Sequence, residues 1–159
     1  MNFGKLTKLW RDGARAALLG VRFVGRDPAA AALVVRMAGW VALLSVLVRV
    51  MPLPRVLGLM SPRRRAAAVA RTAAVEERLA HLLDLLLKTD FLFFTPTCWK
   101  RAPVLHRYLA LHGIETRIIF GVRKEGENVL AGHAWLEAGG RPLLEADAPD
   151  YTVTFAFPA

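Results

Sequence analysis

Cysteine is nearly absent from this 159-residue chain, which contains only Cys98. A single cysteine excludes an internal disulfide and a zinc site built on several thiolates. The histidines, at positions 81, 106, 112 and 133, do not show the spacing of metal ligands, so no metal site is predicted. A free thiol is typical of a reducing compartment, and we therefore expect a cytoplasmic protein.

Acidic residues are scarce in the first 75 positions, which contain 13 lysines and arginines but only Asp12 and Asp27, a net charge of +11. The rest of the chain contains nine basic and 11 acidic residues, a net charge of −2. Solvated helix faces, a membrane surface or an acidic protein partner would each account for the basic half. Nucleic acid is not expected, because the basic residues are spread among apolar ones and form no recognised binding motif.

The sequence also lacks a secretory signal, because no small-residue cleavage site follows an early apolar run. Apolar residues at helical spacing predict an amphipathic helix over 5–23. Asp27 and Pro28 form a strong helix start, and the helix should run to about residue 51. It is apolar nearly all round, is long enough to span a bilayer and has Arg36 near its middle. Residues 28–51 therefore form either a buried central helix or a membrane-associated segment.

Two more helices are indicated farther along the chain. Ser61-Pro62 is a second start signal, and leucines at helical spacing predict a helix that ends near residues 88–90. Arginines at 63–65 are unfavourable beside the positive end of a helix, so this helix begins later or the arginines bind an anion. The last helix-like stretch runs from Cys98 to His112, and Pro103 predicts a kink or a helix that begins after it.

The final third of the sequence is typical of strands and tight turns. Strands are predicted at 114–122, 129–137, 141–145 and 151–157. The fold class is therefore α+β, with about four helices followed by a small antiparallel sheet. We divide the chain into a helical basic region, 1–60, and a core, 61–159, which together form one compact domain.

Cys98 stands where a helix start would activate a thiol. Thr97 can cap the helix, and backbone N–H groups with the positive end of the dipole favour the thiolate in the first turn. Lys100 and Arg101 add positive charge, although Arg101 is interpreted as a structural, carboxylate-pairing residue. Alternatively, Cys98 is a small buried hydrophobe among aromatic residues.

His133 is the candidate base, and strand parity identifies its acid. If residues 138–140 form a three-residue loop, His133 pairs directly with Glu145 on one face of the sheet. A two-residue Gly139-Gly140 turn would instead put Glu145 on the other face. Asp147 has the same parity as Glu145 and is the reserve acid. The other three histidines are expected to be surface or cap residues.

A set of motifs resembles the lasso peptide B-type leader peptidases, in their stand-alone form, within the transglutaminase-like superfamily. The resemblance covers roughly residues 61–159. Its segments are Cys98-Trp99-Lys100-Arg101, His112-Gly113-Ile114, Arg117–Lys124, Gly132-His133-Ala134-Trp135-Leu136-Glu137 and Gly140-Arg141-Pro142-Leu143-Leu144-Glu145.

The resemblance implies a papain-like cysteine peptidase that removes the leader from a ribosomally made precursor before macrolactam closure. Carried over, Cys98 is the nucleophile and His133 the base, while Glu145 replaces the usual aspartate. Trp99 and Trp135 are candidate substrate-binding residues, with Trp135 alternatively in the core. The implied partners are the precursor peptide, a separate leader-binding protein and an asparagine-synthetase-like cyclase. No cofactor is evident, and ATP would act through the partner proteins.

The sequence departs from the family at Trp99-Lys100 and at Pro103, where Leu-Pro and an apolar helix former are more usual. Two other functions remain open. The same acyl-enzyme could be captured by an amine, which would make the protein an acyltransferase. Alternatively, the chain is a non-catalytic partner or membrane adaptor that keeps the fold for binding.

Overall fold

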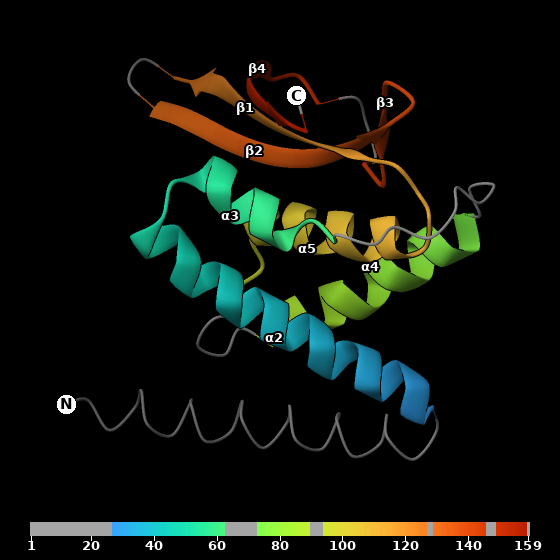
Figure 1. Ribbon diagram of the computed structural model, residues 1–159. Coiled ribbons are helices and arrows are strands. Elements are labelled where there is room, and N and C mark those ends of the chain that lie inside the picture. Colours follow the sequence, from blue (N-terminus) through green and yellow to red (C-terminus); the bar gives the residue numbers. More distant parts are fainter. Residues whose placement is uncertain (1–26, 63–72, 90–93, 127–128, 146–148, 159) are drawn as a thin grey trace.

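The computed structural model describes residues 27–62, 73–89, 94–126, 129–145 and 149–158. The helix predicted over 5–23, the arginines at 63–65 and the reserve acid Asp147 lie outside these residues. The described helices are α2 (Pro28–Val50), α3 (Leu53–Met60), α4 (Ala73–Leu87) and α5 (Cys98–Leu111). The strands β1 (Arg117–Glu125), β2 (Val129–Ala138), β3 (Arg141–Leu143) and β4 (Thr152–Phe157) form one antiparallel sheet, ordered β3-β2-β1-β4. The helices cover one face of this sheet (Figure 1), so the predicted α+β class is confirmed.

Helix α2 begins where the sequence predicts. The Asp27 carboxylate accepts a hydrogen bond from the Ala30 N–H at 2.9 Å, and Pro28 occupies the first turn. The other oxygen of Asp27 pairs with Arg78 at 2.9 Å, which ties the start of α2 to α4. The capping residue therefore also contacts α4 through this exposed ion pair.

Helix α2 has a buried side and an exposed apolar side. Met37, Val41 and Leu44 are fully buried, whereas Val35 and Val50 are largely exposed. Within the described ranges, α2 alone is long and apolar enough to cross a membrane, judged by length and composition, and 28% of its most apolar window is buried. One side of α2 thus belongs to the core, and the other leaves apolar surface uncovered by the described chain.

Helix α3 was not predicted from the sequence. Pro52 and Pro54 indicate an end to helical structure, but Pro52 is the N-cap and Pro54 lies in the first turn, where an N–H needs no intrahelical acceptor. Val56, Leu57 and Met60 bury one face of the helix.

Arg107 joins α5 to two of its neighbours, α2 and α3. It donates a hydrogen bond to the Met60 carbonyl of α3 at 2.6 Å and lies 3.7 Å from the centre of the Trp40 ring of α2. Burial lowers the pKa of Arg107 from its ordinary value. The partly buried guanidinium therefore holds α2 and α3 against α5.

Helix α5 lies between the sheet and the other helices (Figure 1). It runs without a break through Pro103, so the predicted late start is wrong. Proline removes only one intrahelical bond, and the buried packing of Leu105 and Leu109 holds the helix across it. His106 is also buried, against expectation, and its Nδ1 lies 2.8 Å from the Thr116 hydroxyl.

The sheet has two distinct faces. Ile118, Ala134 and Leu136 belong to the hydrophobic core formed with the helices. Because side chains alternate along a strand, His133 and Trp135 project from the opposite face. This alternation places the candidate base on the face of the sheet that the helices do not cover.

The turn between β2 and β3 differs from the predicted one. Ala138 pairs directly with Arg141, so the loop is the two residues Gly139-Gly140, both with positive φ. Two consecutive residues with left-handed backbone conformation form the tight turn that matches the twist of the strands, and glycine adopts this conformation without strain. The predicted three-residue loop, and the direct pairing of His133 with Glu145 that it implied, are therefore wrong. Strand β3 also ends at Leu143 and not at residue 145.

Candidate active site

Cys98 is the first residue of α5 and is partly buried against the hydrophobic core. Thr97 is the N-cap, as predicted, but its hydroxyl makes no capping bond and lies 3.5 Å from the Thr95 carbonyl oxygen. The Thr97 carbonyl accepts hydrogen bonds from the N–H groups of Lys100 and Arg101, at 3.1 Å each, which closes the first turn. The thiol therefore stands at the positive end of the helix that organises the fold.

His133 and Glu145 are brought together, although by another route than the predicted register. The Nε2 atom of His133 lies 3.3 Å from Oε2 of Glu145, and both side chains are partly buried. The ladder with β3 ends at Leu143, and Leu144 then adopts a left-handed conformation with φ of 60°. This reversal turns Glu145 toward His133 after the regular alternation has ended.

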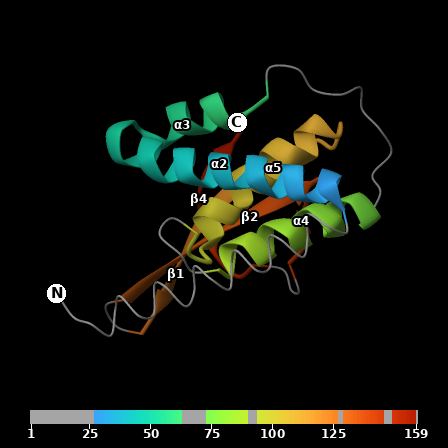
Figure 2. The same ribbon diagram turned by 90° about the horizontal axis from the view of Figure 1, so that it is seen from below.

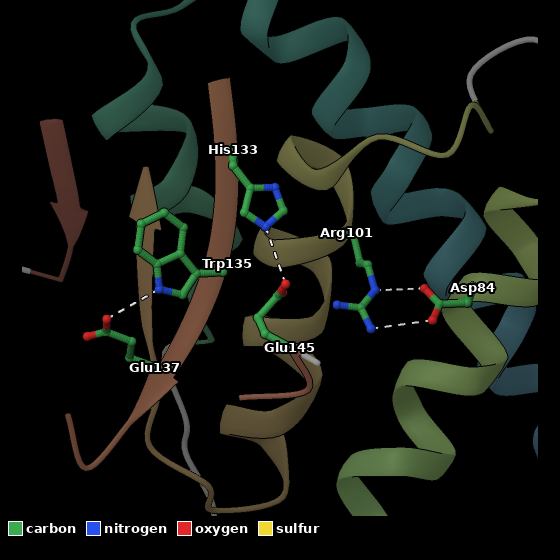
Figure 3. A network of polar contacts seen from close by, with 6 residues as sticks. All are labelled: Asp84, Arg101, His133, Trp135, Glu137 and Glu145. Carbon is green, nitrogen blue, oxygen red and sulfur yellow. Dashed lines mark hydrogen bonds and ion pairs between the residues drawn. The ribbon is translucent and has the colours of Figure 1, made fainter. Parts of the chain in front are cut away.

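Two aromatic rings enclose the imidazole of His133. Trp135 stacks with it at 5.9 Å between ring centres and an interplanar angle of 17°. Tyr151, just before β4, lies 5.3 Å from it on a tilted plane. The Trp135 Nε1 donates to Glu137 at 3.2 Å, which fixes the indole (Figure 3). Trp135 is only 3% exposed, so it supports the base and offers little surface to a substrate.

Gly121 makes room for this aromatic group. It pairs directly with His133 across β1 and β2. A Cβ at this position would lie 2.8 Å from the Cβ of Tyr151 and 3.0 Å from the Trp135 ring. Only glycine therefore lets both rings reach His133. The roles of Gly121 and Tyr151 were not predicted from the sequence, because their contacts depend on the crossing from β3 to β4.

His133 projects from the face of β2 opposite the one that packs on the helices, and Figure 3 shows its imidazole reaching toward Glu145 on the side of the strand where α5 is drawn. Helix α5 packs against β2, so the two elements that bear the candidate nucleophile and base are neighbours. Among the described residues, no hydrogen bond joins the Cys98 sulfur to the His133 ring. Glu145 binds Nε2, which leaves Nδ1 as the nitrogen that can exchange a proton with a thiol.

The basic residues after Cys98 are held by partners. Arg101 forms a double contact with Asp84 of α4, with Nε–Oδ1 at 2.7 Å and Nη2–Oδ2 at 3.3 Å (Figure 3). Its predicted carboxylate-pairing role is therefore confirmed. Lys100 is buried, donates to the Thr95 hydroxyl and lies 5.2 Å from the centre of the Trp99 ring. Trp99, the residue after Cys98, is itself partly buried.

The described part of the chain contains no cluster of histidine, cysteine and acidic residues suited to a metal ion. The fold and this group of side chains define an α+β protein with a cysteine–histidine–acid candidate site. The model of the transglutaminase-like superfamily matches residues 31–156, and the chain belongs to that superfamily. The match begins within α2, so it includes the first described helices. Comparison with the curated proteins and with the solved structures gave no match.

Proposed function

We propose that the protein is a cysteine peptidase that removes the leader from a lasso precursor peptide. The observation that carries the proposal is the His133–Glu145 pair, whose histidine lies on the strand that packs against the helix beginning with Cys98. Membership of the transglutaminase-like superfamily supports chemistry by a cysteine nucleophile. The finer assignment, to leader removal, rests on the resemblance of the segments around Cys98, His133 and Glu145.

The mechanism follows from the roles of these groups. His133 takes the thiol proton through Nδ1, and the Cys98 sulfur attacks the carbonyl carbon at the leader junction. Backbone N–H groups at the start of α5 stabilise the resulting oxyanion. The C–N bond then breaks as His133 gives its proton to the leaving amine, which leaves an acyl-enzyme on Cys98. Water, deprotonated by His133, releases the acyl group and restores the thiol.

Glu145 acts through the imidazole and not on the peptide. Its carboxylate holds Nε2, fixes the ring orientation and stabilises the imidazolium that forms in each step. A glutamate can do this as well as the aspartate more usual in the resembling family, because either carboxylate accepts the same hydrogen bond.

Acyl transfer is the second candidate function, and the superfamily assignment favours it. An amine that reached the acyl-enzyme before water would give an amide in place of a free acid. Analysis of the product distinguishes the two functions, because hydrolysis yields a free carboxylate and transfer yields a new amide. A non-catalytic adaptor would form neither product.

The proposal includes partners. A leader-binding protein would deliver the precursor, an asparagine-synthetase-like cyclase would consume the freed core peptide, and ATP would enter through these partners. We place the reaction in the cytoplasm, with the exposed apolar side of α2 against a membrane surface.

A cleavage assay tests the function. The purified protein is mixed with a candidate precursor from a neighbouring gene, with and without a candidate leader-binding protein, and the products are identified by mass spectrometry. We expect cleavage at one junction, and much faster cleavage with the partner present. An intact precursor under both conditions would overturn the proposal.

A further inference from the structure

Strand β2 has a free edge beside the candidate site. Strand β3 pairs only with Leu136–Ala138. In the described part of the chain, no strand lies beside the preceding residues, Val129–Trp135, on that side. Figure 2 shows the hairpin of β1 and β2 reaching past the described helices, so they do not cover its tip. Figure 3 shows that His133 stands along the same stretch of β2.

The β-ladder indicates which backbone groups face this edge. In a two-residue hairpin, the residues that flank the loop exchange hydrogen bonds, so Ala138 directs its N–H and C=O toward β3. These directions alternate along an antiparallel strand. The backbone groups of Leu130, Gly132 and Ala134 therefore face the free edge, while those of His133 face β1.

This edge lacks the features that normally prevent strand addition. Natural sheets protect their edges with charged residues, prolines or bulges. The segment Val129–Trp135 contains no lysine, acid or proline, and it pairs with β1 without a bulge. Leu130 is 71% exposed and Val129 is 59% exposed. An unprotected apolar edge indicates a surface that is covered when the protein functions.

Gly132 is a second feature that indicates close approach of another backbone to β2. It lies inside β2, directly before His133, and a Cβ built on it would have nothing within 4 Å. The glycine is therefore not required by packing within the described chain. Glycine inside a strand commonly marks a place where a ligand or another backbone comes close.

We propose that the free edge of β2 binds the substrate as an added strand. The occupant is an extended segment of the precursor peptide, whose backbone pairs with Leu130 and Gly132 and leads the scissile bond to His133 and Cys98. This inference rests on the proposed function and adds the mode of substrate recognition. Backbone pairing supplies affinity that depends little on the peptide sequence, and Leu130 offers an apolar contact beside it.

Removal of one edge N–H tests the proposal. Leu130→Pro deletes a donor that faces the free edge and leaves the bonds to β1 in place. Lys124→Pro is the matched control, because Lys124 is the direct cross-strand partner of Leu130. The Lys124 N–H faces the opposite edge of the β1–β2 hairpin. Lys124 lies past Val122, the last residue of β1 that pairs with β4, so this N–H is also unpaired with β4.

The probes are N-acetyl-trialanyl chloromethyl ketone, the same ketone with N-methylated backbone amides, and iodoacetamide. The rate of alkylation of Cys98 is followed by intact mass. We expect Leu130→Pro to slow the peptide ketone roughly five- to tenfold, as loss of one hydrogen bond would. Lys124→Pro should leave that rate unchanged, and the iodoacetamide rate should be unchanged in both variants. On the wild type, the N-methylated ketone should react as slowly as the peptide ketone does with Leu130→Pro.

Two results would overturn the edge proposal. The peptide ketone would react at the same rate with both proline variants, and the two ketones would react at the same rate with the wild type. The comparison of the ketones on the wild type keeps the test valid if Leu130→Pro does not fold. A dimer in sedimentation equilibrium that Leu130→Pro dissociates would also overturn it, because a second copy would then occupy the edge. Each of these results leaves the proposed function standing if the wild type still cleaves the precursor, whereas absence of cleavage defeats the function itself.

Discussion

At the scale of single residues, the candidate base is held from three sides. Glu145 binds one nitrogen of the His133 imidazole, and the rings of Trp135 and Tyr151 limit its rotation. A general base must keep one orientation through the reaction, and these contacts provide it without a bond to the nucleophile. We expect each of these contacts to influence the reaction rate through the position of the imidazole.

Glu145→Gln should lower the single-turnover rate constant by about 10²- to 10⁴-fold, because the amide cannot stabilise the imidazolium. Alkylation of Cys98 by iodoacetamide should continue, since the thiol itself is untouched. The measurement is single-turnover cleavage of the precursor, with Asp147→Asn as the control that should change the rate little. A nearly active Glu145→Gln beside an inactive Asp147→Asn would assign the role to Asp147.

Gly121→Ala should displace the aromatic group around His133, because the added Cβ would lie 2.8 Å from the Cβ of Tyr151. We expect a loss of about 1–3 kcal/mol in the free energy of unfolding, together with a lower cleavage rate. Denaturant unfolding and the cleavage assay measure the two effects.

Gly39→Ala is the control, since a Cβ at Gly39 in α2 meets nothing within 4 Å. It should raise the free energy of unfolding by about 0.5–1 kcal/mol and leave cleavage unchanged. If both alanine variants behave alike, the crowding assigned to Gly121 is wrong.

The residues of the candidate site were largely predictable, but their geometry was not. Parity identified Glu145 through a three-residue loop, whereas the structure has a two-residue loop and a left-handed Leu144. A loop one residue shorter reverses every face that parity assigns, and only the backbone at Leu144 restores the contact. No local pattern in the sequence indicates that a leucine adopts this conformation.

At the scale of secondary-structure elements, α5 connects the chemistry to the fold. Its first residue is the candidate nucleophile, one side packs on the sheet and the other contacts α2, α3 and α4. Two arginines hold it in place, with Arg101 on Asp84 of α4 and Arg107 on the Met60 carbonyl of α3. The position of the thiol relative to β2 therefore depends on contacts of α5 with the other helices.

Arg101→Ala should lower the thermal midpoint by about 2–4 °C, because the pair with Asp84 is partly exposed and contributes about 1 kcal/mol at most. A double-mutant cycle with Asp84→Ala measures the coupling by thermal unfolding. Arg78→Ala, at the exposed pair with Asp27, is the control and should change the midpoint less. Additive effects of Arg101→Ala and Asp84→Ala would contradict a direct interaction.

Proline explains what the predicted helices missed. Pro52 and Pro54 end α2 as expected, but they also concealed α3, and Pro103 was interpreted as a kink or a late start, because proline has no N–H and its ring clashes inside a helix. In α5, burial of one helix face stabilises the helix by more than the one lost hydrogen bond costs, whereas in α3 the prolines lie where no intrahelical bond is lost. The start of α2 was predictable because the Asp27 cap is a local interaction.

At the scale of the whole molecule, most of the positive charge and the exposed apolar side of α2 belong to the half of the sequence that precedes the candidate site. The first 75 positions have a net charge of +11, and α2 exposes Val35, Val46 and Val50. Neither feature lies in the elements that carry His133 and Glu145. We expect the N-terminal half to direct docking and the C-terminal half to carry out the chemistry.

Neutralising Arg63, Arg64 and Arg65 to glutamine should weaken association with anionic lipid vesicles, most strongly at low salt. Vesicle co-sedimentation over a salt series measures this effect, and neutral vesicles provide the reference. Cleavage of a precursor in solution should not change. Unaltered association at low salt would show that these arginines are only a solvated surface.

The most direct test of the account compares the wild type with Cys98→Ser in single-turnover cleavage, with the leader-binding partner present. The hydroxyl is nearly isosteric with the thiol but far less ionised, so cleavage should disappear while the thermal midpoint stays close to that of the wild type. Mass spectrometry of acid-quenched wild-type reactions should also show an acyl group on Cys98. Retained cleavage by folded Cys98→Ser protein would contradict the assignment of Cys98 as the nucleophile.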